Sequence, residues 1–307
     1  MHEKKLTNYQ DNEISLVELV NISLNRKGLL SSIVIGFSLL SLIYSLTLPN
    51  IYTSDALLAP SSQDESLSSR LGGLSSIAGF AGIDIGNETA TLSAEAMERI
   101  KSFDFFAEHF LSNIKLENLM AVTRWDQETN FLIYDESIYD IVEKKWVREV
   151  SFPKKAKPSN QEAYLVYLDK IDINEDQNNN FVSISINHHS PILAKEWLGI
   201  VIHKINESMR DIEKKSAEDS INFLNQSTNF SNVQSIQFAI SSLLEMQMQE
   251  YMLASVNQDY VYRIISKPLI PEEPSSPNRL LICILGFLFG VIVSGAIVIT
   301  IYIKKYI

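Results

Sequence analysis

The sequence is poor in cysteine: a single residue, Cys283, occurs among 307. No disulfide can therefore form within the chain, and a zinc site built from several cysteines is excluded. Cys283 lies inside a long apolar stretch, so the cysteine content neither supports nor excludes an oxidising compartment.

Sequence motifs of catalysis are also lacking. There is no Gly-x-Ser-x-Gly and no His-Glu-x-x-His, and the glycines of the Ser/Gly-rich stretch 61–91 are not followed by Gly-Lys-Ser/Thr. The His188-His189 pair has no cysteine or carboxylate cluster at ligand spacing. We therefore expect no catalytic residues, cofactor or metal ion. Three tryptophans could stack on sugars, but core packing is the favoured role for each: Trp125, Trp146 and Trp197.

Two stretches contain no charged residue, 28–48 and 280–303. As helices they would reach roughly 31 and 36 Å, enough to cross a hydrocarbon core of about 30 Å. The first begins after a polar leader of 27 residues and ends at Leu48-Pro49-Asn50, which is a poor cleavage site, so a retained anchor is favoured over a signal peptide. The sequence thus predicts two transmembrane helices.

The cations beside these stretches predict the orientation of the chain. Arg26 and Lys27 precede the first stretch, and Lys304 and Lys305 follow the second, whereas Arg279 on the other side opposes this pattern. The balance places the leader 1–27 and the tail 304–307 in the cytoplasm. The region 49–279 then lies outside the cytoplasm.

Negative charge prevails in the region between the spans. The whole chain carries −11, and since the two ends are neutral or basic, the region 49–279 carries about −13. Such a surface argues against nucleic acid as a partner and against docking onto anionic lipid headgroups.

Periodicity predicts a mixed α and β fold for the outer region. Residues 51–60 read as a strand that follows the first span, and 92–110 and 136–150 read as helices. Residues 164–173 and 181–187 alternate at period two and predict a hairpin around the polar turn 174–180. Residues 260–265 predict a closing strand.

A long helical pattern begins at Ser190-Pro191, where serine suits the N-cap and proline the first turn. Apolar residues recur at three and four from Leu198 onward and resume after a polar break at 226–232. One continuous helix over 191–258 would span about 100 Å and would need partner helices. Two ordinary helices with a turn at 226–232 are the alternative.

The segment 267–279 contains four prolines and cannot form a helix, since each removes a backbone donor and restricts its predecessor. An extended strut that fixes the outer domain against the second span is expected. Within that span, Gly286, Gly290 and Ser294 form a small-xxx-small ladder that allows helices to approach closely, which predicts packing or oligomerisation there. Glycine is, however, common in membrane helices.

The order of these features resembles the polysaccharide co-polymerases, the Wzz-type chain length determinant family. The most specific part of the resemblance is Pro271-x-x-Pro274-x-x-Pro277 leading into a glycine-rich span. Two further parts contribute: the strand-to-helix step at Asn187-His188-His189-Ser190-Pro191, and the small-residue loop 71–86.

The resemblance implies an α+β periplasmic domain, with a membrane-proximal α/β base and a long helix, between two transmembrane helices. It implies side-by-side assembly into a homo-oligomeric ring that sets the length of O-antigen or a related surface glycan. The partners would be a Wzy-type polymerase, a lipid-linked glycan and membrane lipid, and the protein would not be an enzyme. Only 304–307 follow the second span, so the class with a cytoplasmic kinase domain is not expected.

Two other functions remain open from the residues alone. A two-span sensor would need a cytoplasmic output module, which the leader of 27 residues cannot supply. A periplasmic adaptor or export accessory protein would use the long helices as a coiled-coil arm.

Overall fold

The computed structural model describes residues 26–61, 92–227 and 234–306, and these form two compact units. One unit contains residues up to 49 together with 276–307, and the other contains 50–275. Most of the leader, the small-residue loop 71–86 and much of the polar break at 226–232 lie outside the described residues, as does the final residue.

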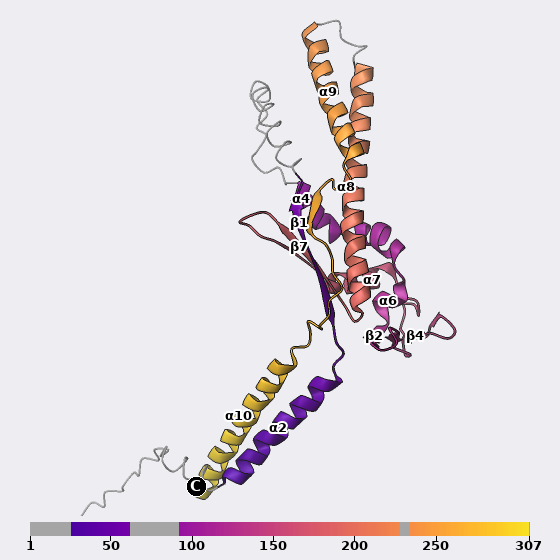
Figure 1. Ribbon diagram of the computed structural model, residues 1–307. Coiled ribbons are helices and arrows are strands. Elements are labelled where there is room, and N and C mark those ends of the chain that lie inside the picture. Colours follow the sequence, from indigo (N-terminus) through magenta and orange to yellow (C-terminus); the bar gives the residue numbers. More distant parts are fainter. Residues whose placement is uncertain (1–25, 62–91, 228–233, 307) are drawn as a thin grey trace, which may run out of the picture. The chain divides into compact units, whose positions relative to one another are not determined.

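The first unit is a pair of apolar helices, α2 (Lys27–Thr47) and α10 (Arg279–Tyr306), which pack against each other (Figure 1). Both helices are long and apolar enough to cross a membrane. Most of their hydroxyl groups bond within the helix; Ser38 Oγ, for example, donates to the Val34 carbonyl at 2.8 Å. Hydroxyls satisfied in this way are compatible with an apolar surrounding. The two helices fit a two-pass membrane protein.

The second unit is built on a four-stranded antiparallel sheet in the order β6-β7-β1-β8. The strands are β1 (Tyr52–Pro60), β6 (Ile171–Glu175), β7 (Val182–His188) and β8 (Tyr262–Ser266). In β7, buried and half-buried residues alternate strictly, which is the pattern of a strand with one face in the core. The predicted strands at 51–60, 181–187 and 260–265 are confirmed.

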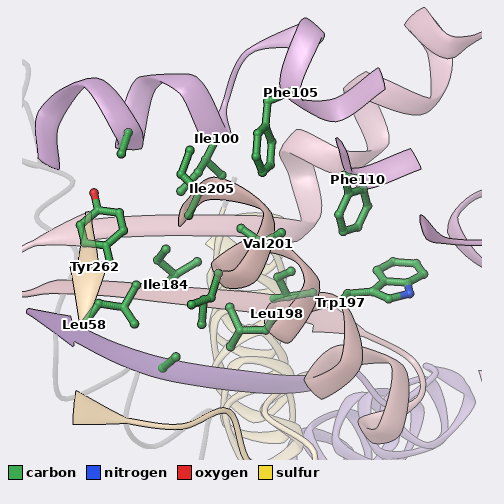
Figure 2. Close-up of a cluster of buried hydrophobic side chains, with 14 of the residues drawn as sticks. Leu58, Ile100, Phe105, Phe110, Ile184, Trp197, Leu198, Val201, Ile205 and Tyr262 are labelled. Carbon is green, nitrogen blue, oxygen red and sulfur yellow. The ribbon is translucent and has the colours of Figure 1, made fainter. Parts of the chain in front are cut away.

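Helix α8 (Pro191–Ser227) covers the inner face of this sheet with its first turns. Figure 2 shows Trp197, Leu198, Val201 and Ile205 from α8 among side chains of the strands and of the 92–110 segment. Each of the four is at most 2% exposed, so core packing is confirmed as the role of Trp197. Trp125 and Trp146 are half-buried.

The predicted helix 92–110 is interrupted. It consists of α4 (Leu92–Ile100), α5 (Phe103–Phe105) and a π-helical turn η1 (Phe106–Phe110), followed by η2 (Leu111–Asn113) and α6 (Leu116–Met120). Ser102 explains the break, because its extended backbone and its hydroxyl, which accepts from the Phe105 N–H, begin a new helix. The phenylalanines at 105, 106 and 110 are buried in the core.

Two predictions between residues 121 and 175 are wrong. Residues 136–150 do not form a helix but a short hairpin, β4 (Tyr139–Asp140) with β5 (Lys145–Trp146), beside a second hairpin, β2 (Val122–Trp125) with β3 (Leu132–Tyr134). Residues 160–170 form helix α7 (Asn160–Lys170) rather than the first part of a strand, because Ser159 and Glu162 form a capping box. Only residues 171–175, which form β6, pair with β7 as in the predicted hairpin.

The long helical pattern forms two helices. Helix α8 ends at Ser227, and α9 (Gln234–Val256) runs beside it (Figure 1). The 37 residues of α8 span about 55 Å and α9 packs beside α8, so a single helix of about 100 Å is wrong and the alternative of two helices is confirmed. Of the turn predicted at 226–232, only 226 and 227 are described, and both belong to α8. The α+β base with a long helix, between two apolar helices, is nevertheless the fold class predicted.

Candidate functional site

The strand-to-helix step at 187–190 connects four parts of the second unit. Asn187 Oδ1 accepts from Thr53 Oγ1 of β1 at 2.6 Å, and the Ser190 hydroxyl accepts from the Leu193 N–H as the N-cap of α8. His189 Nδ1 lies 3.0 Å from the carbonyl oxygen of Asn50, two residues before β1. Asn187 thus bonds to a side chain of β1, Ser190 to the backbone of α8, and His189 to the backbone that precedes β1.

His188 is the buried member of this step, with 1% of its surface exposed. Its Nδ1 accepts the Ser190 N–H at 2.9 Å, so the ring proton lies on Nε2, which donates to the Asn118 carbonyl at 3.1 Å. The ring also contacts Trp197, with centroids 4.6 Å apart. Burial lowers the pKa of His188 to about 3, so the neutral ring joins β7, α6 and α8 as a structural element.

The Pro-rich segment returns to the same region. The Ser275 N–H donates to the Ile51 carbonyl at 2.9 Å, and the Ser275 and Thr53 hydroxyls are 2.6 Å apart. Farther along β1, Ser54 Oγ donates to the Leu269 carbonyl at 2.8 Å. The segment 267–275 thus follows the part of β1 that β8 leaves unpaired. Of the motif prolines, Pro271 and Pro277 are half-buried and Pro274 is exposed.

The beginning of β1, the Pro-rich segment and the start of α8 therefore meet at one group of hydrogen bonds, which we call the junction: Asn50, Thr53, Asn187, His189, Ser190 and Ser275. Residues 50 and 275 are the two ends of the second unit. The sequence marked Ser190-Pro191 as a helix start and pointed to 187–191 as a whole by resemblance, but it gave no sign that Ser275 and Thr53 bond to one another.

Asn206 is a second structural centre that the sequence did not reveal. Its Oδ1 accepts the N–H groups of Val261 and Tyr262 at 2.8 and 2.9 Å, and its Nδ2 donates to the carbonyls of Tyr262 and Ile202. All four hydrogen-bonding positions of the amide are used, and only 4% of the residue is exposed. This side chain attaches α8 to the chain that returns from α9 into β8.

In the first unit, Gly286 and Gly290 of α10 face α2. A Cβ atom at Gly286 would overlap the side chain of Ser41, and one at Gly290 would lie 3.1 Å from both Phe37 Cβ and Val34 Cα. Ser294 is 8% exposed and donates to the Val291 carbonyl within α10. The ladder thus allows close packing of two helices of one chain, and its role in oligomerisation stays a prediction.

The comparison with protein families gave one match. Residues 12–120 fit the family model described as "Wzz: Chain length determinant protein". The predicted family resemblance is confirmed. The match covers just over a third of the chain, from the leader through α2 and β1 to the end of α6. It supports a role for this chain in regulating the length of a polysaccharide.

Solved structures and curated proteins were compared as well. A chain described as "full-length bacterial polysaccharide co-polymerase" is 15% identical with a TM-score of 0.41, and the alignment covers 95% of this chain and 99% of that chain. A fragment of WzzB, a polysaccharide co-polymerase from Salmonella Typhimurium, is 14% identical with a TM-score of 0.31, covering 74% and 100%. The comparison with curated proteins gave no match.

Proposed function

We propose that this protein sets the chain length of a bacterial surface polysaccharide, O-antigen or a related glycan, without catalysing its synthesis. The observation that carries the proposal is the match of residues 12–120 to the chain length determinant family. Two helices able to cross a membrane agree with a process that acts on a lipid-linked glycan at the inner membrane. Both termini would lie in the cytoplasm and the second unit in the periplasm.

The proposed mechanism needs a homo-oligomer, arranged as a ring, that holds the growing glycan or its Wzy-type polymerase and biases termination. The helical pair α8 and α9 supports this, since large apolar side chains remain exposed on it: Ile212, Phe223, Phe238, Leu243, Met248, Met252 and Val256. An apolar surface of this kind on a helix pair is suited to contacts with neighbouring copies. The mass of the detergent-solubilised complex tests the oligomer directly.

The hydrogen bonds of the junction connect the start of α8 to the two segments of chain that lead to the spans. A change in how neighbouring α8–α9 pairs contact one another would reach the beginning of β1 and the Pro-rich segment through Asn187, His189 and Ser275. These are the points at which the chain enters and leaves the second unit. We infer that the junction couples the state of the outer domain to the spans.

Deletion of the gene followed by gel analysis of the glycan tests the function. The proposal expects the modal length to be lost and replaced by a broad distribution, with restoration by the wild-type gene. The alternative, a periplasmic adaptor or export accessory protein with α8 and α9 as a coiled-coil arm, expects loss of export with an unchanged ladder. That second result would contradict length control.

A further inference from the structure

Basic charge is concentrated in one part of an otherwise acidic chain. The chain carries −11, but the residues 141–158, which we call the basic loop region, contain two glutamates and six basic residues: Lys144, Lys145, Arg148, Lys154, Lys155 and Lys157. All five lysines are exposed. Among the described residues, Lys144, Lys145, Lys155 and Lys157 take part in no ion pair. Their charges are therefore available to an anionic partner.

The basic loop region also exposes apolar side chains. Phe152 is 96% exposed and Val142 is 87% exposed. Three more apolar side chains in the region are between 37% and 55% exposed: Ile141, Val147 and Val150. A combination of exposed apolar side chains with lysines is typical of surfaces that enter a lipid headgroup layer.

Both loops of this region are held by specific contacts. Arg148 donates to the Lys155 and Ala156 carbonyls at 2.9 and 2.8 Å, and it pairs with Glu162 at 2.7 Å. This closes the loop that presents Phe152. In the β4–β5 hairpin, Asp140 Oδ1 accepts the Val142 and Glu143 N–H groups at 2.8 and 3.0 Å, which fixes the turn. Phe152 and Val142 are thus presented by ordered turns.

Aromatic contacts join this region to the start of β1. Trp146 contacts Tyr139, with ring centroids 5.1 Å apart, and Tyr139 contacts Tyr134 of the neighbouring hairpin. Trp125 on the paired strand contacts Tyr52 edge to face at 5.6 Å. Tyr52 follows the last residue of α2 by five positions, a length of chain that reaches at most about 17 Å.

We propose that the basic loop region lies on the headgroup layer of the membrane that the chain itself crosses, with Phe152 and Val142 inserted and the lysines beside anionic phospholipid. The average charge of about −13 on the outer region argued against docking onto anionic headgroups, but that average hides this locally basic surface. At physiological salt, exposed charges farther away than about 8 Å are largely screened, so the local lysines decide the interaction. The proposal is independent of any role in glycan length.

The test uses the full chain in vesicles of phosphatidylcholine, with or without phosphatidylglycerol. In a Cys283→Ser background, an environment-sensitive fluorophore is placed at Phe152→Cys or at the control Phe238→Cys, a 76% exposed phenylalanine on α9. We expect a blue shift and quenching by headgroup-attached nitroxide at 152 in the phosphatidylglycerol vesicles, and no nitroxide quenching at 238, which lies on the surface proposed to contact neighbouring copies. Circular dichroism checks that each variant is folded.

The lysines are tested by changing all five to glutamine, with the same five changed to arginine as the charge-preserving control. The glutamine variant should lose most of the nitroxide quenching at 152, and the arginine variant should keep it. Equal nitroxide quenching at 152 and 238 would overturn the proposal. So would quenching that the glutamine variant retains. A blue shift at 152 without nitroxide quenching would mean that a second copy of the chain covers the loops, and would also overturn it.

Discussion

Gly286 of α10 lies so close to Ser41 of α2 that a single methyl group on the glycine would overlap the serine side chain. A leucine at 286 must push the two helices apart, and overpacking of this kind costs about 1–3 kcal/mol. We expect Gly286→Leu to lower the temperature at which the detergent-solubilised protein unfolds. Size-exclusion recovery after heating measures this.

Gly295→Leu is the matched control, because a Cβ at Gly295 meets no atom within 4 Å. It should leave the unfolding temperature unchanged. Equal losses for the two variants would show that the approach of Gly286 to Ser41 does not stabilise the helix pair.

Replacement of the buried amide at 206 should destabilise the second unit. Asn206→Asp removes both side-chain donors and places a carboxylate where only 4% of the residue is exposed. A buried polar group left without its partner costs about 1–3 kcal/mol, and a charged group costs more. Denaturant unfolding followed by circular dichroism should show a loss of several kcal/mol. Asn222→Asp, at an exposed position of the same helix, should be nearly neutral.

Because His188 is neutral in the folded protein, we expect the protein to lose stability in acid. Its pKa is about 3 in the folded protein against about 6.5 when unfolded, so below pH 6.5 the unfolded state binds more protons. The free energy of unfolding should fall by up to about 1.4 kcal/mol per pH unit between pH 6.5 and 3 from this residue. The His188→Gln variant should be less stable at pH 7.5, and its free energy of unfolding should fall less between pH 6.5 and 3. A His188 ring proton signal that titrates near 6.5 would contradict the prediction.

For Glu213 on α8 we expect acid to have the opposite effect on the stability of the fold. Burial raises its pKa, and Glu250 of α9 and Glu95 of α4 raise it further. The carboxylate therefore opposes folding above its raised pKa, and this cost is relieved as the pH falls through that value. Glu213→Gln should increase stability at pH 7.5, and by less in acid. The exposed Glu218→Gln should change stability little at either pH, and a loss at 213 would contradict the account.

The parts of the fold that could be predicted are those with a long or regular pattern. The two uncharged stretches were sufficient to predict α2 and α10, and the alternation in 181–187 was sufficient to predict β7. Ser190-Pro191 marked the start of α8. The prediction of a helix at 136–150 failed because the apolar residues of this segment suit a helix. In the structure, Asp140 and the positive φ of Lys144 impose a turn between Tyr139 and Trp146.

The helix at 160–170 was missed for a related reason. Tyr164, Val166 and Leu168 alternate as in a strand, but the local capping box of Ser159 and Glu162 favours a helix and outweighs that alternation. The junction could not be predicted, since it joins Thr53, Asn187 and Ser275 from distant parts of the chain by side-chain hydrogen bonds with no sequence period. The basic loop region was hidden by averaging its charge over the whole outer domain.

The glycan length distribution tests the central claim most directly. In a strain that lacks the gene and carries it under an inducible promoter, the account predicts a broad distribution without induction. A defined modal length should appear as expression of the wild-type protein rises. A distribution that is the same at every expression level, with the protein present in the membrane, would contradict chain-length control.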